Sequence, residues 1–332
     1  MMEIVVRKRN PWIDSLKAFA IYLVIVGHVL SNCMTNGAEL RVTGIIYFIH
    51  IPLFLVISGI LVKDKHIDCA FWIGLIKRFV VPYTVWTIVL TTFYLGVSHL
   101  IHDGIVANLT TYFGNWCHSF LWFIKAYLVS IILWQLLQKL SCVSRLVLGT
   151  VLLFGINLLV QKCSALSEIA SLSLYSYTLF GAGACVKKIL NKINLYVAVL
   201  LVLCFLLCLP LATHEHNYFE CSFSHMLNHG DWYVFIIRFV AGLSLSIALI
   251  KMWNICQITP PRWRKIGQRT LQIYMLQSLL VEAILNRIIH LSNSIYGVFE
   301  AFILSLFITI VCFEIIKVTS QCKIIKILFW GL

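Results

Sequence analysis

The sequence has 332 residues, of which 61% are hydrophobic and only 12% charged, and its mean hydropathy is +0.92. Several apolar runs reach the roughly 20 residues that a helix needs to cross a bilayer, so the composition excludes an ordinary soluble enzyme. The net charge of +13 would also suit a nucleic-acid-binding protein. The basic residues, however, are concentrated in alternate loops between apolar segments, as in membrane proteins of defined topology.

Hydropathy predicts ten membrane-spanning helices, so the expected fold class is an all-α membrane bundle. The predicted spans are 14–32, 43–62, 71–98, 120–139, 145–161, 172–186, 195–212, 232–252, 266–285 and 295–316. An even number of spans puts both termini on one side, and the Lys/Arg-rich loops put that side in the cytosol. We expect one integral-membrane domain over 1–332, with short cytosolic ends at 1–12 and 317–332 and a long outer loop at 213–231.

The first span carries three ionisable residues, Asp14, Lys17 and His28. At 100° and 1.5 Å per residue, Lys17 and His28 share one helix face and lie roughly 16 Å apart along the axis, with Asp14 one turn before Lys17. Ionisable groups are costly in lipid and mark functional sites. His28 lies past the midplane, where its imidazole can act as a general base toward a hydroxyl from outside. Alternatively, Lys17 snorkels to the cytosolic headgroups and His28 bonds a neighbouring helix.

The second and third spans add polar groups on both sides of the membrane. His50 would lie at a depth comparable with His28, and Pro52 bends its helix by freeing a backbone carbonyl. The pair Ser58-Gly59 allows close approach of another backbone. Lys77-Arg78 stands at the cytosolic mouth, followed by a kink at Pro82. These two cations suit a phosphate-bearing ligand, but they equally satisfy the positive-inside rule.

The later spans offer fewer signals. Trp122 is typical of the interfacial aromatic belt, and we expect Lys125 and Arg238 to snorkel toward headgroups. The outer loop 213–231 contains four histidines, two of them with the i,i+4 spacing of metal ligands. No fixed spacing ties the histidine pairs together, so we expect a solvated loop and no metal.

Five short motifs occur in a defined order over nearly the whole chain: Lys17, ten residues, then His28; Pro52-Leu53-Phe54 with Ser58-Gly59; Arg78 with Pro82; Trp122-Phe123; and Ile266-Gly267, Thr270-Leu271 and Ile273-Tyr274. Together they resemble the membrane acyltransferase 3 family, whose integral-membrane O-acyltransferases modify sugars and surface polysaccharides. The resemblance is to the compact branch without an extracellular hydrolase-like domain, which includes fucose O-acetylase-like and enterobacterial common antigen acetyltransferases.

This resemblance implies a transfer of acetyl from acetyl-CoA, a donor substrate and not a tightly bound cofactor, to a hydroxyl of a carbohydrate or lipid-linked glycan at a bacterial inner membrane. The expected roles divide into three groups: His28 is the catalytic base, with Asp14 and Ser58 in support; Lys17, Lys77 and Arg78 bind the donor; and His50, Trp122, Tyr274 and Gln277 contact substrate.

Two positions depart from the family pattern. Lys17 stands where an Arg is usual, and a Lys cannot form the forked contact of a guanidinium. Gln277 stands where many members have a His, so Gln277 can only position or hydrogen-bond. The alternative to an acyltransferase is a transporter or flippase of a lipid-linked glycan that uses the intramembrane charges as a relay. Consumption of a thioester would separate the two.

Overall fold

The computed structural model describes residues 10–36, 41–101, 109–118, 121–160, 164–212 and 232–332, and within these ranges the chain is helical with no β-strand. The α-helices are α1 Pro11–Cys33, α2 Arg41–Leu61, α3 Cys69–Leu75, α4 Val81–Ile101, α5 Leu109–His118, α6 Trp122–Leu136, α7 Cys142–Val160, α8 Ser164–Val186, α9 Leu195–Ala212, α11 Trp232–Cys256, α12 Pro261–Gly267, α13 Thr270–Gln277, α14 Ile295–Thr319 and α15 Lys323–Leu328. The chain also forms two π-helical segments, η2 at Ile76–Val80 and η4 at Ser278–Ile284. Two short 3₁₀ turns lie at Leu190–Lys192 and Leu285–Arg287.

The all-α class is confirmed, but the count of ten spans is not. Among the described residues seven helices are long and apolar enough to cross a membrane: Pro11–Cys33, Arg41–Leu61, Cys69–Gly96, Cys142–Val160, Leu166–Val186, Phe235–Cys256 and Ile295–Thr319. Two further apolar helices, Trp122–Leu136 and Leu195–Pro210, are shorter. The predicted span 266–285 is divided among α12, α13 and η4. Hydropathy averages over a window and therefore does not detect such breaks.

The sixth predicted span begins too late. The helix α8 starts at Ser164, eight residues before the predicted start at Leu172. Its first turns are polar, and Ser171 donates to the Asn157 side chain of α7 at 2.8 Å. A hydroxyl satisfied in this way is tolerated in a membrane helix, so the polar start does not end the helix.

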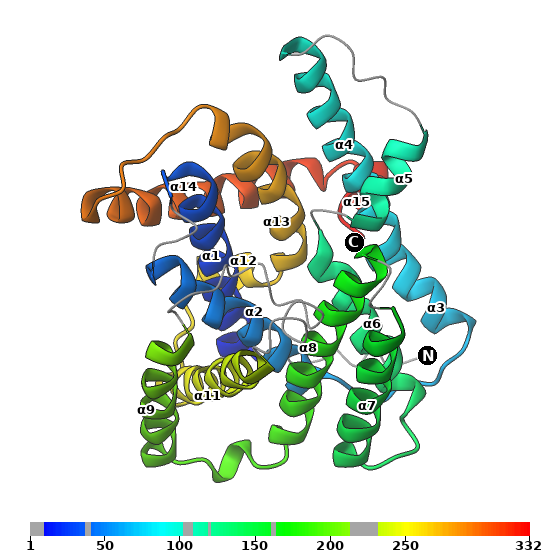
Figure 1. Ribbon diagram of the computed structural model, residues 1–332, viewed down its shortest axis with the longest axis vertical. Helices are drawn as coiled ribbons and strands as arrows, with labels where there is room; N and C mark the ends of the chain where they lie inside the picture. Colours follow the sequence, from blue (N-terminus) through cyan, green and yellow to red (C-terminus); the bar gives the residue numbers. More distant parts are fainter. Residues whose placement is uncertain (1–9, 37–40, 102–108, 119–120, 161–163, 213–231) are drawn as a thin grey trace, which may run out of the picture.

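The centre of the bundle is α1, which packs against α2, α11, α12, α13 and α14. Figure 1 shows α1 and α2 in the middle, with α8 and α11 beside α2 and with α13 and α14 beside α1. The α2–α8 contact is close because Gly59 lies against the Phe180 carbonyl, where a Cβ would overlap it. This confirms the prediction that Ser58-Gly59 admits another backbone.

The C-terminal segment, predicted as a short cytosolic end at 317–332, packs against the bundle. The helix α14 continues to Thr319, and α15 brings Trp330 into a buried position beside Trp86. The Trp86 indole donates to the Phe329 carbonyl at 2.9 Å, and Gln272 donates to the Trp330 carbonyl at 2.9 Å. Aromatic burial with satisfied polar groups thus ties the tail to α4 and α13.

Candidate active site

A cavity of about 250 Å³ lies inside the bundle, lined by side chains from α1, α2, η2, α6, α8, α11 and α13. The structure brings seven of the predicted site residues to its wall: Lys17, His28, His50, Ser58, Arg78, Trp122 and Tyr274. Asp14, Lys77 and Gln277 are not among the lining residues. Lys17 and His28, predicted to share one helix face, therefore do line one common cavity.

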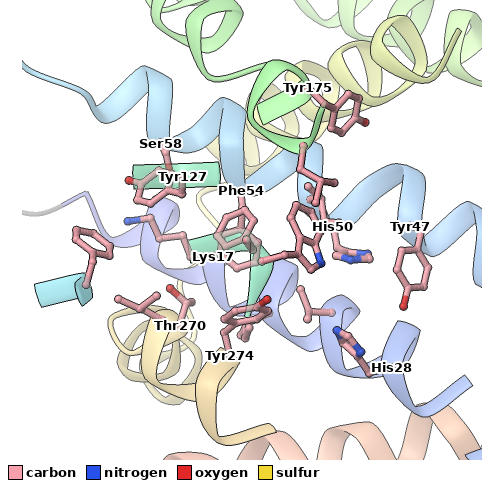
Figure 2. A pocket seen from close by; sticks show the side chains of 18 of the residues that line it. Lys17, His28, Tyr47, His50, Phe54, Ser58, Tyr127, Tyr175, Thr270 and Tyr274 are labelled. Carbon is pink, nitrogen blue, oxygen red and sulfur yellow. The ribbon is translucent and has the colours of Figure 1, made fainter. Parts of the chain in front are cut away.

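One end of the cavity is cationic. Figure 2 shows Lys17, Ser58, Tyr127 and Thr270 gathered there. The Tyr127 hydroxyl hydrogen-bonds Ser58 and lies in the field of Arg78, which places the guanidinium at the same end. Lys17 is half-buried and Arg78 is exposed. A mobile anion can therefore reach both charges.

Arg78 stands in the middle of η2, and the local sequence explains the π-helical turn. Pro82 has no N–H to give to the carbonyl four residues earlier, which is that of Arg78. The turn widens, and the Val81 N–H bonds Ile76, five residues back. Gly331, at a φ of +60°, lies against the Arg78 carbonyl. The predicted kink thus turns Arg78 toward the cavity and leaves its neighbour Lys77 exposed outside the lining.

The predicted catalytic residue Asp14 has another neighbour. It is buried, and its carboxylate accepts a hydrogen bond from the Gln268 side chain at 3.1 Å. The adjacent Gly267 packs against the Asp14 backbone carbonyl so closely that a Cβ would overlap it. The Ile266-Gly267 motif therefore joins α12 to the start of α1, next to the turn that carries Lys17.

The other end of the cavity is built around His28. Its Nδ1 lies 3.1 Å from Glu282 Oε1, and the two side chains are only 17% and 15% exposed. In the neutral imidazole that donates from Nδ1 to a carboxylate, Nε2 is the nitrogen that accepts. The His28–Glu282 pair is thus the arrangement of a general base held by a carboxylate.

Sequence reasoning missed Glu282. It belongs to η4, inside the predicted ninth span, and an acidic residue in an apolar span was itself a usable signal. Its Oε1 also accepts from the Ser278 hydroxyl at 3.1 Å and lies 3.5 Å from the Gln277 amide nitrogen. Gln277 is fully buried. It therefore meets Glu282 behind His28, and not the cavity where we expected it to contact substrate.

His50 and Tyr47 extend the His28 end. The His50 Nδ1 lies 2.7 Å from the Ile46 carbonyl, which can only accept, so Nδ1 carries the proton. The Tyr47 ring meets both imidazoles edge to face, with centroid distances of 4.9 Å to His50 and 6.4 Å to His28. The Tyr47 hydroxyl lies 3.3 Å from the Ser31 hydroxyl. Each of the three rings therefore has a polar contact beside its ring contact: His28 with Glu282, His50 with Ile46 and Tyr47 with Ser31.

Aromatic rings separate the two ends. Figure 2 shows Phe54 and Tyr274 between the Lys17 end and the His28 end. The Phe123 ring lies 6.3 Å from Phe54, 5.7 Å from Tyr274 and 5.9 Å from a parallel Tyr127. We call Phe54, Phe123 and Tyr274 the aromatic collar. Its apolar walls suit the thin uncharged part of a ligand whose charged part stays at the cationic end.

No group of three or more His, Cys, Asp and Glu side chains that could hold a metal ion occurs in the described ranges. The histidine-rich loop 213–231 lies outside the described residues.

The helical bundle and its apolar spans define an integral-membrane protein, and a cavity lined by ionisable and aromatic side chains lies within it. The family model described as an acyltransferase domain matches residues 10–316. The chain therefore belongs to this family, the membrane acyltransferase 3 family of the sequence resemblance, and is a membrane acyltransferase. No curated protein and no solved structure gave a match.

Proposed function

We propose that this acyltransferase moves an acetyl group from cytosolic acetyl-CoA to a hydroxyl of a cell-surface or lipid-linked sugar, at a bacterial inner membrane and in the manner of the compact branch. The observation that carries the proposal is that one and the same cavity has Lys17 and Arg78 at one end and the His28–Glu282 pair at the other. A charged nucleotide and a neutral thioester need these two environments.

The donor enters from the cationic end. The Arg78 guanidinium forks onto phosphate oxygens, and the Lys17 ammonium adds a point charge. The pantetheine arm then passes the aromatic collar to bring the thioester near His28. The separation of roughly 16 Å along α1, from 1.5 Å per residue, is the length that this arm spans.

The acceptor hydroxyl approaches from the opposite side. His28 Nε2 accepts its proton as the hydroxyl oxygen attacks the thioester carbonyl, and Glu282 stabilises the imidazolium. The C–O bond of the ester forms and the C–S bond breaks. The proton then passes from His28 to the leaving thiolate, which departs as free CoA. Holding both substrates in one cavity makes the reaction effectively unimolecular.

The remaining predicted residues take supporting roles. Ser58 lies beside Tyr127 at the cationic end (Figure 2), so we assign it to donor binding and not to the reacting group. Asp14 positions α12 through Gln268. Gln277 supports Glu282, while His50 and Trp122 line the cavity wall.

The test measures release of free CoA from acetyl-CoA by the protein in nanodiscs, with a pool of cell-surface glycans. His28→Ala is compared with His66→Ala, a matched change at an exposed loop histidine. Removing a general base lowers kcat by about 10²- to 10⁴-fold, and we expect His66→Ala to match wild type. Full turnover in folded His28→Ala would refute the mechanism. Wild-type protein that releases no CoA would favour a transporter.

A further inference from the structure

A third cation lines the cavity, away from the two assigned to the donor. Arg238 of α11 is 4% exposed and belongs to the cavity wall. The sequence led us to expect a side chain that snorkels to the headgroups. The structure instead buries the guanidinium inside the bundle. Because a charge within a membrane bundle is expensive, it marks a functional position.

Packing of α11 on α2 fixes where Arg238 lies. Pro52 leaves the Phe48 carbonyl without its usual helical donor, and Gly242 of α11 packs against Pro52 and this carbonyl. Arg238 is one turn before Gly242, and its Cζ lies 5.6 Å from the centroid of the Phe48 ring. On α2, Phe48 stands between Tyr47 and His50. Arg238 is therefore at the His28 end of the cavity.

Neighbouring side chains give this end the character of a sugar site. Tyr175 of α8 lines the cavity and its ring packs on Phe235, three residues before Arg238, at 5.7 Å. Glu168, two turns before Tyr175 on the same face of α8, also lines the cavity. Aromatic rings pack against the apolar faces of sugars, and a carboxylate accepts hydrogen bonds from hydroxyls.

We propose that Arg238 binds an anionic group of the acceptor, so that the preferred acceptor is a sugar bearing a carboxylate or a phosphate. A guanidinium has five N–H donors in a fixed fork. It can therefore keep its contacts within the protein and still bind two anionic oxygens. The Phe48 ring adds a cation–π contact that helps to hold the guanidinium at the cavity wall. The donor phosphates are bound at the opposite end, beyond the aromatic collar.

This inference rests on the proposed function, because it makes the His28 end the acceptor site. The test titrates wild-type protein in nanodiscs with three probes that differ in one group: methyl β-D-glucuronide, methyl β-D-glucoside 6-phosphate and methyl β-D-glucoside. Binding is followed by saturation-transfer NMR. We expect at least one anionic probe to bind about tenfold more tightly than the neutral glucoside, as for a hydrogen-bonded ion pair. The anionic probe that binds more tightly shows whether the acceptor site prefers a carboxylate or a phosphate.

Two variants locate the effect. Arg238→Gln should reduce the anionic probes to the affinity of the neutral glucoside and leave that affinity unchanged, while Arg238→Lys should keep part of the preference. Arg78→Gln is the matched control at the other end and should weaken only CoA. The proposal would be overturned if the wild-type protein bound all three probes equally or bound none of them. It would also be overturned if Arg238→Gln weakened the neutral glucoside as much as the anionic probes, or if Arg78→Gln abolished the preference for the anionic probes.

CoA binding and CoA release, measured on the same samples, keep the two proposals apart. Protein that releases CoA but treats the three probes alike refutes the anionic acceptor alone. Protein that discriminates the probes through Arg238 but binds no CoA refutes the acetyl-CoA reaction alone.

Discussion

The two ends of the cavity are built differently. At the His28 end His50 is buried and His28 and Tyr47 are half-buried. Each of the three is held by a partner: His28 by Glu282, His50 by the Ile46 carbonyl, and Tyr47 by Ser31. At the cationic end Arg78 is exposed and Lys17 half-buried. Proton transfer needs a base fixed within hydrogen-bond reach. Capture of a diffusing anion needs charges that it can reach.

Each end also has a π-helical segment, and the two segments have different roles. In η2 the widened turn precedes Pro82, and Arg78 lines the cavity. In η4 the widened turn holds Ser278 and Glu282 together behind His28. Such segments are frequent at functional sites. The comparison predicts that changes at the His28 end act on kcat and changes at the cationic end on KM.

After His28 itself, the largest effect is expected at Glu282. In Glu282→Gln the His28 ring loses the charge that stabilises its protonated form, so kcat should fall by at least about 10-fold, the lower bound for metal-bound histidines that lose a carboxylate. The fall could reach about 10⁴-fold, as when a triad Asp becomes Asn. The KM for acetyl-CoA should stay close to the wild-type value. CoA release under saturating and limiting acetyl-CoA separates the two constants.

Glu314→Gln is the matched control for this change, since Glu314 pairs with Lys317 on the exposed side of α14. It should leave both constants unchanged. Glu282→Asp keeps the charge and should recover part of kcat. A Glu282→Gln variant that raised KM with an unchanged kcat would mean that Glu282 serves binding, and the distinction between the two ends would fail.

Much of this comparison was readable from the sequence. A charged residue in an apolar run is conspicuous, so Lys17, His28 and Arg78 were predicted, and all three line the cavity. The positions of most of the long apolar helices also followed from hydropathy, because the free energy of burying a span depends mainly on the composition of that segment.

Other features depend on contacts between distant segments. The pairing of His28 with Glu282 joins residues 254 positions apart in sequence, and hydropathy carries no such information. The burial of Arg238 follows from the packing of Gly242 on Pro52. Lys77 and Arg78 are adjacent and equally basic, so only the direction of the turn before Pro82 distinguishes the one that lines the cavity.

The neighbours Lys77 and Arg78 give the next prediction. Arg78→Gln should raise the KM for acetyl-CoA about tenfold, because a forked contact to phosphate is lost, with little change in kcat. Lys77→Gln removes the same charge one residue away and should raise KM much less. Initial rates over a range of acetyl-CoA concentrations provide the measurement. Equal effects from both variants would indicate that the site attracts CoA by general positive charge alone.

The smallest effect is expected for a substitution outside the cavity, at Asp64, which serves as a reference for the changes at the two ends. Asp64, in the segment between α2 and α3, accepts from both Nη atoms of Arg145, at 2.5 and 3.0 Å. These hydrogen bonds hold the pKa of the Asp64 carboxyl below its usual value. The stabilisation is therefore complete above the unfolded-state pKa, near 4, and is lost as the pH falls through the lower pKa of the folded state.

Because the Asp64 side chain is 57% exposed, solvent screens the pair and its contribution is about 1 kcal/mol or less. Asp64→Asn should lower the melting temperature slightly at pH 7, and the difference from wild type should shrink as the pH is lowered below 4. The variant should keep its kcat and KM, since Asp64 does not line the cavity. A changed KM in Asp64→Asn would show that the α2–α3 segment is coupled to Arg78, and the cationic end would then extend beyond the residues that line it.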